Sequence, residues 1–176
     1  GHYCKEGGMN KRKAGEDFYF LQKFFDLGNF SECNETRIIP SPRPSERVPF
    51  GTGPAVSEFL KTENELHTFN PELFTILKIF IALIPSFYES DNEKVFSLLS
   101  MTNNRLYQFL DQNNFKKKLE EIKINSSTKT NFIKRFFTWF NMFRMLKFLN
   151  FSKEDYPDKE VTKAAKRLLK SKGHQN

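Results

Sequence analysis

The chain has 176 residues and a net charge of +7, from 28 lysines and arginines against 21 acids, which indicates an anionic partner such as nucleic acid, a phosphorylated substrate or a membrane surface. Its 21 phenylalanines argue against a disordered chain, and its two cysteines, Cys4 and Cys33, fit reduced thiols in a cytoplasmic protein rather than a disulfide framework. The longest apolar run, 73–84, contains Lys78 and falls well short of the roughly twenty residues that a bilayer span needs.

The first sixty residues are predicted to mix one helix with extended and irregular segments. A helix is expected over 15–27, followed by Gly28 as a cap, because four apolar residues share one face: Phe20, Leu21, Phe24 and Phe25. The β-branched run Thr36–Ser41 predicts one buried strand. Residues 40–54 hold five prolines and two glycines, so we expect a stiff, shaped loop, and loops of this length usually carry function.

After Gly53 nearly every segment has helical periodicity. The expected helices are 71–84, capped by Asn70 and ended by Pro85; 91–100, capped by Asp91; 102–123, capped by Thr102; 128–149; and 157–170. The helix over 128–149 is the most apolar, and one stripe of it is expected in the core: Phe132, Phe136, Trp139, Phe143 and Leu146. The lysines and glutamates over 116–123 are most simply a solvated face with pairs three or four residues apart.

A glycine turn and an acidic pair near the N-terminus form the one motif that we connect with chemistry. Gly7, Gly8 and Met9 are followed by Glu16 and Asp17, which open the first predicted helix. Two acids at a helix start are, by themselves, explained by the helix dipole and the free N–H groups. The order of glycine turn, acidic pair, strand and a Ser-Pro-Arg loop at 41–43 is more restrictive. Together these features resemble the acceptor-side segment of family 2 glycosyltransferases with the GT-A fold.

This resemblance implies that Asp17 is the general base that deprotonates the acceptor hydroxyl, with Glu16 as its acidic neighbour. Inverting sugar transfer needs a carboxylate within hydrogen-bond reach of the attacking hydroxyl, and a helix N-terminus would fix the direction of Asp17 and keep it ionised. The implied substrate-binding residues are Gly8, Arg43, Ser45 and Arg47. Guanidinium groups on the proline-rich loop suit the diphosphate that leaves.

The resemblance covers residues 1 to about 60 and lacks the nucleotide-binding half of these enzymes, with its acidic metal motif. We therefore expect the chain to be the C-terminal part of a longer transferase and to be inactive by itself. The expected fold is mainly α: residues 1–60 are a short α/β remnant of a GT-A-like domain, and residues 61–176 are a helical bundle. A divalent metal, Mn²⁺ or Mg²⁺, is expected only in the full-length enzyme, with no metal site in this chain. The resemblance implies that the partners, bound by the full-length enzyme, are a nucleotide-sugar donor and a hydroxyl acceptor.

The alternative hypothesis is a basic helical module that binds nucleic acid or a protein without catalysis. Nucleic acid is disfavoured because the lysines are spread over all the predicted helices instead of being concentrated on one. Peripheral membrane contact of a cytoplasmic protein stays open as a prediction, although the basic residues of 128–149 do not gather on one face. His67 is interpreted as a surface histidine rather than a metal ligand, because no cysteine or second histidine lies near it.

Overall fold

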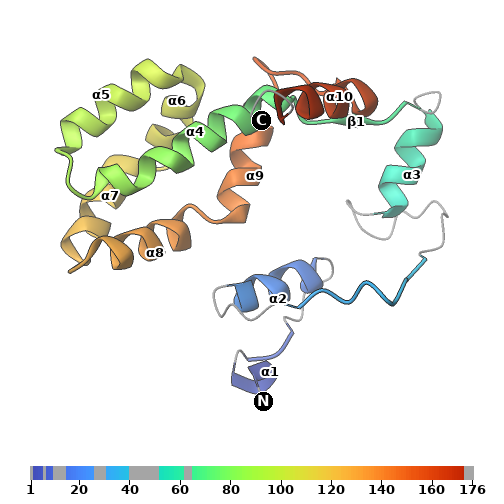
Figure 1. Ribbon diagram of the computed structural model, residues 1–176, viewed down its shortest axis with the longest axis horizontal. Coiled ribbons are helices and arrows are strands. Elements are labelled where there is room, and N and C mark those ends of the chain that lie inside the picture. The colour runs from blue at the N-terminus through green and yellow to red at the C-terminus, as the bar shows by residue number, and fades with distance from the viewer. Residues whose placement is uncertain are drawn as a thin grey trace. The chain divides into compact units, whose positions relative to one another are not determined.

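A computed structural model describes residues 2–5, 7–9, 15–25, 31–39, 52–61 and 65–172. The chain divides into two compact units, Gly1–Glu65 and Leu66–Asn176. Helices dominate the described residues (Figure 1), and the sheet found among them consists of two strands of two residues each. The expectation of a mainly α fold is therefore confirmed.

The first unit contains α1 (His2–Lys5), α2 (Glu16–Phe25) and α3 (Thr52–Lys61). Helix α2 begins at the acidic pair, as predicted. The strand predicted over 36–41 is wrong for its described part: 36–39 forms no strand, and Ile38 is 92% exposed, since no neighbouring strand among the described residues pairs with it. Helix α3 begins at Thr52, inside the predicted loop. Pro54 does not prevent this, because it lies in the first turn of the helix, where the missing N–H of a proline is not needed.

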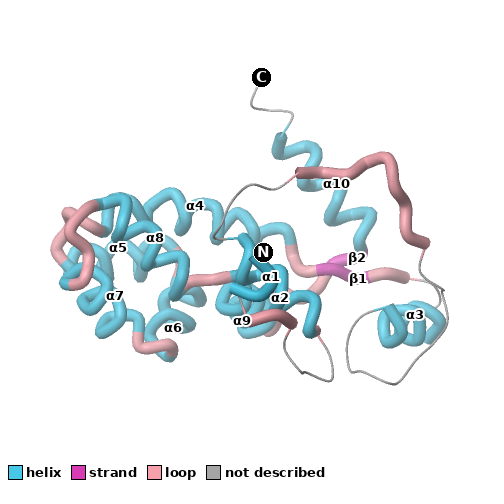
Figure 2. The backbone as a smooth tube through the Cα atoms, turned by 90° about the horizontal axis from the view of Figure 1, so that it is seen from below, coloured by secondary structure: helices cyan, strands magenta, loops and turns pink. Residues whose placement is uncertain are grey.

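A short pair of strands joins two segments of the second unit that are far apart in the sequence. Strand β1 (His67–Thr68) runs antiparallel to β2 (Lys159–Glu160), with His67 opposite Glu160 (Figure 2). The backbone N–H of Val161 donates to the carbonyl of Leu66 at 2.8 Å and extends the pairing. We call this pairing the clasp. Between its strands lie α4 (Pro71–Phe87), α5 (Asn92–Thr102), α6 (Asn104–Gln112), α7 (Phe115–Ile124), α8 (Lys129–Trp139) and α9 (Met142–Phe151), and α10 (Val161–Lys172) follows it.

An aromatic cluster forms the core of the second unit. Helix α4 packs against α5, α8 and α10, and α7 packs against α8. The ring of Phe136 is fully buried, with its centroid 5.7–6.4 Å from those of six buried aromatic neighbours: Phe80, Phe87, Phe115, Phe132, Trp139 and Phe140. The large rings that the composition predicted to drive folding thus pack mainly against one another.

Two predicted helix ends are wrong because tertiary contacts override the local signal. Helix α4 continues through Pro85 to Phe87. Pro85 has no N–H to donate to the preceding turn, but Ile84 and Phe87 are both fully buried and hold the last turn against the core. The last helix starts at Val161 instead of 157, since 159–160 pair with β1 in the clasp.

The predicted helix over 102–123 is divided into α6 and α7. Asn114 lies in the left-handed region, with φ 55° and ψ 37°, and interrupts the helix; asparagine tolerates this conformation better than most residues. The cap of α6 is Asn103, not Thr102: Asn103 Oδ1 accepts from the N–H of Leu106 at 2.9 Å, while the Thr102 hydroxyl donates to the carbonyl of Leu98.

The predicted helix over 128–149 is likewise divided, into α8 and α9. Asn141 Oδ1 accepts from the N–H of Arg144 and caps α9. Because of this break, the apolar stripe predicted to lie in the core ends at Trp139. Leu146 is 43% exposed, and Phe148 and Leu149 are buried in the core instead of Leu146.

The prediction that Lys123 lies on a solvated face is wrong. Its amine is half-buried and donates to the carbonyl of Ser90 and to Asn92 Oδ1, both at 2.6 Å, so it connects α7 to the start of α5. Burial lowers the pKa of Lys123, and the nearby Asp91 partly offsets the effect. Within the part of the chain that the structure describes, no helix has both the length and the apolar character that crossing a membrane would require.

Candidate functional site

The acidic pair occupies the first turn of α2. Gly15, with φ 70°, precedes the helix, and its carbonyl accepts the first helical hydrogen bond, from Tyr19 N at 3.0 Å. A positive φ favours glycine, so the sequence fixes the point at which the helix begins. Glu16 is half-buried and Asp17 is exposed, with Asp17 Oδ1 accepting from the N–H of Phe18 at 2.7 Å. The result is a solvent-accessible carboxylate whose direction is set by the helix terminus.

The glycine turn lies against this same helix. Gly7 and Gly8 both have positive φ, 71° and 65°, and Gly8 O accepts from Lys23 Nζ of α2 at 3.1 Å. Tyr3 of α1 makes the second contact, because its ring lies 5.3 Å from that of Phe20, measured between centroids. A Cβ atom on Gly8 would meet the Tyr3 ring at 3.2 Å, so the turn needs glycine for space as well as for conformation.

The structure therefore places the glycine turn against the helix that the acidic pair opens, through Lys23 of that helix, and does not place the remaining members of the predicted site. Arg43, Ser45 and Arg47 lie outside the described residues, so their roles stay predictions. Among the residues that are described, no group of three or more His, Cys, Asp or Glu side chains could hold a metal ion. His67 is exposed at its place in β1. Cys4 and Cys33 are both free and exposed.

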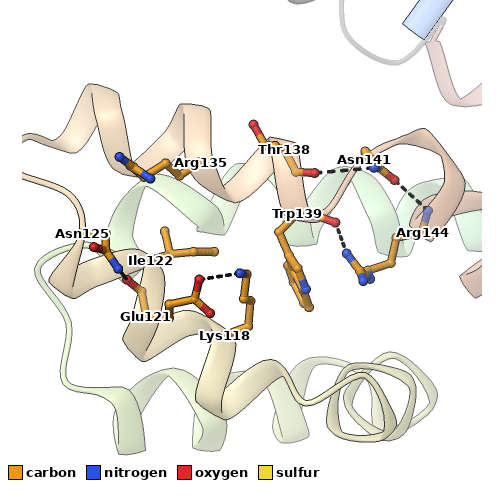
Figure 3. A pocket seen from close by; sticks show the side chains of 9 residues that line it. All are labelled: Lys118, Glu121, Ile122, Asn125, Arg135, Thr138, Trp139, Asn141 and Arg144. Atoms are coloured by element: carbon orange, nitrogen blue, oxygen red, sulfur yellow. Dashed lines mark hydrogen bonds and ion pairs between the residues drawn. The ribbon is translucent and has the colours of Figure 1, made fainter. Parts of the chain in front are cut away.

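A second feature, a cavity of about 430 Å³, lies between α7, α8 and the start of α9 in the helical unit (Figure 3). We did not predict this cavity from the sequence, because a continuous helix over 128–149 would direct Arg144 differently. The cap residue Asn141 was the available signal for the break. The cavity is lined by Lys118, Glu121, Ile122, Asn125, Arg135, Thr138, Trp139, Asn141 and Arg144.

The break between α8 and α9 folds Arg144 back onto Trp139. The Arg144 guanidinium lies over the indole ring, 4.4 Å from its centroid, and its Nη1 donates to the carbonyl of Trp139. Phe115 stacks on the indole as well, with centroids 5.7 Å apart and 29° between the planes. Burial lowers the pKa of Arg144 from its ordinary value. The ordinary pKa of arginine is so high that the Arg144 guanidinium still stays charged near neutral pH.

In comparisons with known proteins, no protein-family model, curated protein or solved structure matches the chain. Its function is therefore inferred from the residues described above.

Proposed function

We propose that the chain supplies the acceptor side of an inverting glycosyltransferase, with Asp17 as the general base. The observation that supports this proposal is the packing of the Gly7–Gly8 turn against the helix that Glu16 and Asp17 open. The same order of turn and acidic pair carries the resemblance to family 2 enzymes. In this proposal residues 1–60 are the end of a GT-A-like catalytic domain, and the following helices are attached to it.

The proposed reaction transfers a sugar from a nucleotide-sugar donor to a hydroxyl. The acceptor oxygen attacks the anomeric carbon, the bond from that carbon to the nucleoside diphosphate breaks, and the hydroxyl proton moves to the Asp17 carboxylate. The exposure of Asp17 leaves room for an acceptor beside it, and the helix terminus keeps the carboxylate aimed in one direction. Arg43 and Arg47 would balance the charge of the leaving diphosphate, while Ser45 and Gly8 would contact substrate.

The nucleotide and the divalent metal, Mn²⁺ or Mg²⁺, belong in this proposal to a nucleotide-binding half that is separate from these 176 residues. The chain alone is then expected not to consume sugar nucleotides. Turnover of a sugar nucleotide by the isolated chain would contradict this part of the proposal, whereas binding of an acceptor without turnover would agree with it.

The decisive test compares the full-length transferase with its Asp17→Asn variant over a panel of nucleotide-sugar donors. Asparagine retains the oxygen that accepts from Phe18 N but cannot take a proton, so kcat should fall about a hundredfold, as expected for loss of a general base. Donor affinity should change little. The matched control is Glu93→Gln, which neutralises an exposed first-turn acid of α5. If Asp17→Asn is as active as the unmodified enzyme, Asp17 only stabilises the helix start.

One observation favours the alternative of a binding module. Helix α10 carries five basic residues and no acid in twelve positions, which suits an anionic partner: Lys163, Lys166, Arg167, Lys170 and Lys172. Binding of an oligonucleotide that weakens steeply with salt would support this alternative. Equal and negligible binding from low to high salt would remove it. Contact with a membrane surface stays a prediction of the same kind.

A further inference from the structure

The cavity between α7, α8 and α9 holds more positive charge than its own carboxylate balances. Lys118 Nζ pairs with Glu121 Oε1 at 2.7 Å. The Arg135 side chain makes no hydrogen bond or ion pair with another described residue, and the Arg144 guanidinium contacts the carbonyl and ring of Trp139 but no described carboxylate. Three cations and one carboxylate therefore leave this lining with an excess of two positive charges.

Arg144 is already held in position to receive an anion. Its contacts with the Trp139 carbonyl and indole ring restrict the guanidinium, so little side-chain freedom would be lost on binding. Burial lowers the pKa of this arginine because the group gives up water without gaining a counter-charge. An anion in the cavity would supply that counter-charge, and a guanidinium binds phosphate oxygens through paired N–H donors.

The size and lining of the cavity indicate more than a bare inorganic ion. Its volume of about 430 Å³ lies within the range of small-molecule sites and exceeds what one phosphate group would fill. Asn125, Thr138 and Asn141 offer polar groups along the wall, and Ile122 lies between the two ends of the lining (Figure 3). A ligand with an anionic group and a polar body matches this combination.

We propose that the cavity binds a soluble phosphorylated small molecule of about the size of a sugar phosphate. Arg144 anchors the phosphate, the remaining N–H groups of Lys118 assist it, and Arg135 lies at the opposite end of the lining (Figure 3). Phosphate is favoured over a carboxylate because its charge of about two matches the uncompensated charge of the lining. The cavity is made only of residues 118–144 of the helical unit, so this proposal does not depend on the role of Asp17.

Trp139 makes the test direct, because it is the only tryptophan in the chain and lines the cavity. The 176-residue chain is titrated with glucose 1-phosphate at constant ionic strength, and binding is followed by tryptophan fluorescence. Glucose and inorganic phosphate are titrated in parallel. Saturable binding of glucose 1-phosphate, tighter than that of inorganic phosphate, is expected, with no response to glucose. A response to glucose of equal strength would overturn the assignment of the phosphate contact.

Three substitutions of equal charge change locate the site. Arg144→Gln should weaken binding about tenfold or more, and Arg135→Gln, at an exposed position, about threefold to fivefold. The control Lys134→Gln removes an exposed cation of α8 that does not line the cavity, and should leave the affinity within about twofold. The Arg135 side chain is exposed, so its variant should fold and stays informative if Arg144→Gln impairs folding.

Vesicles containing phosphatidic acid distinguish a lipid-borne phosphate from a soluble one. A response to these vesicles without a response to glucose 1-phosphate would overturn the proposal in favour of a lipid headgroup. Equal weakening by Lys134→Gln and Arg135→Gln would also overturn it, because the binding would then reflect diffuse surface charge. Absence of binding by all of these probes would show that the cavity is not a phosphate site.

Discussion

Removal of the Phe136 ring tests the description of the aromatic core. Phe136 is fully buried, and seven aromatic neighbours lie within 6.4 Å of it, measured between ring centroids. Phe136→Ala loses the transfer free energy of the ring and leaves a cavity among rigid neighbours that cannot easily close it. Such substitutions cost about 3–5 kcal/mol, and the lost ring-to-ring contacts place this one toward the upper end.

The assay is urea unfolding of the 176-residue chain, followed by far-ultraviolet circular dichroism so that the signal does not depend on the nearby Trp139. The matched control is Phe74→Ala on α4, where the same side chain is 42% exposed, and its cost should stay near or below about 1 kcal/mol. Phe136→Leu, which keeps most of the volume, should fall between the two, at about 1–2 kcal/mol. A loss below about 2 kcal/mol for Phe136→Ala, or one equal to that of Phe74→Ala, would refute the packing described here.

Two further predictions concern the backbone and pH. Asn114→Val should lower the free energy of unfolding by about 1–2 kcal/mol, because a β-branched residue is strained at φ 55°, whereas Asn114→Gly should be neutral or slightly stabilising; thermal unfolding of both variants checks this. Hydrogen bonds from Thr162 first, and then from Lys163 N–H, lower the pKa of Glu160 below its ordinary 4.5. The stabilisation from Glu160 is thus present above pH 4.5 and lost as pH falls through the lowered pKa. Glu160→Gln should flatten that part of the stability profile measured by unfolding at a series of pH values, and an unchanged slope would contradict the assignment.

Several helix starts were predictable because their signals are local. The Asn70 and Asp91 side chains accept from the N–H two residues later, at 3.1 and 3.2 Å, and the Thr128 hydroxyl accepts from Asn131 N at 3.2 Å. Each cap lies within one turn of the helix that it opens, so a short stretch of sequence contains the information. The same reasoning located the start of α2 at Glu16.

Helix breaks were not predictable from the apolar pattern. Asn114 adopts the left-handed conformation and separates α6 from α7, and Phe140 and Asn141 separate α8 from α9. The apolar periodicity continues with little interruption across both breaks. The break between α8 and α9 determines which side chains reach the core: Phe140 and Phe148 are fully buried, whereas Leu146 is not. The cavity beside Trp139 depends on this break, so a continuous helix over 128–149 predicts its basic residues only as a scattered set.

The clasp has a consequence for how the helical unit folds. Most helix contacts in the unit join neighbours along the chain, as in α5 with α6 and α7 with α8, and such contacts form early. Pairing β1 with β2 instead closes a loop of about 90 residues, and the length-dependent entropy of that closure is about 4 kcal/mol, more than a pair of two-residue strands can repay. The clasp should therefore form last, after the intervening helices have shortened the distance between its strands. Its backbone amides should also exchange with solvent through a local opening well below the free energy of global unfolding.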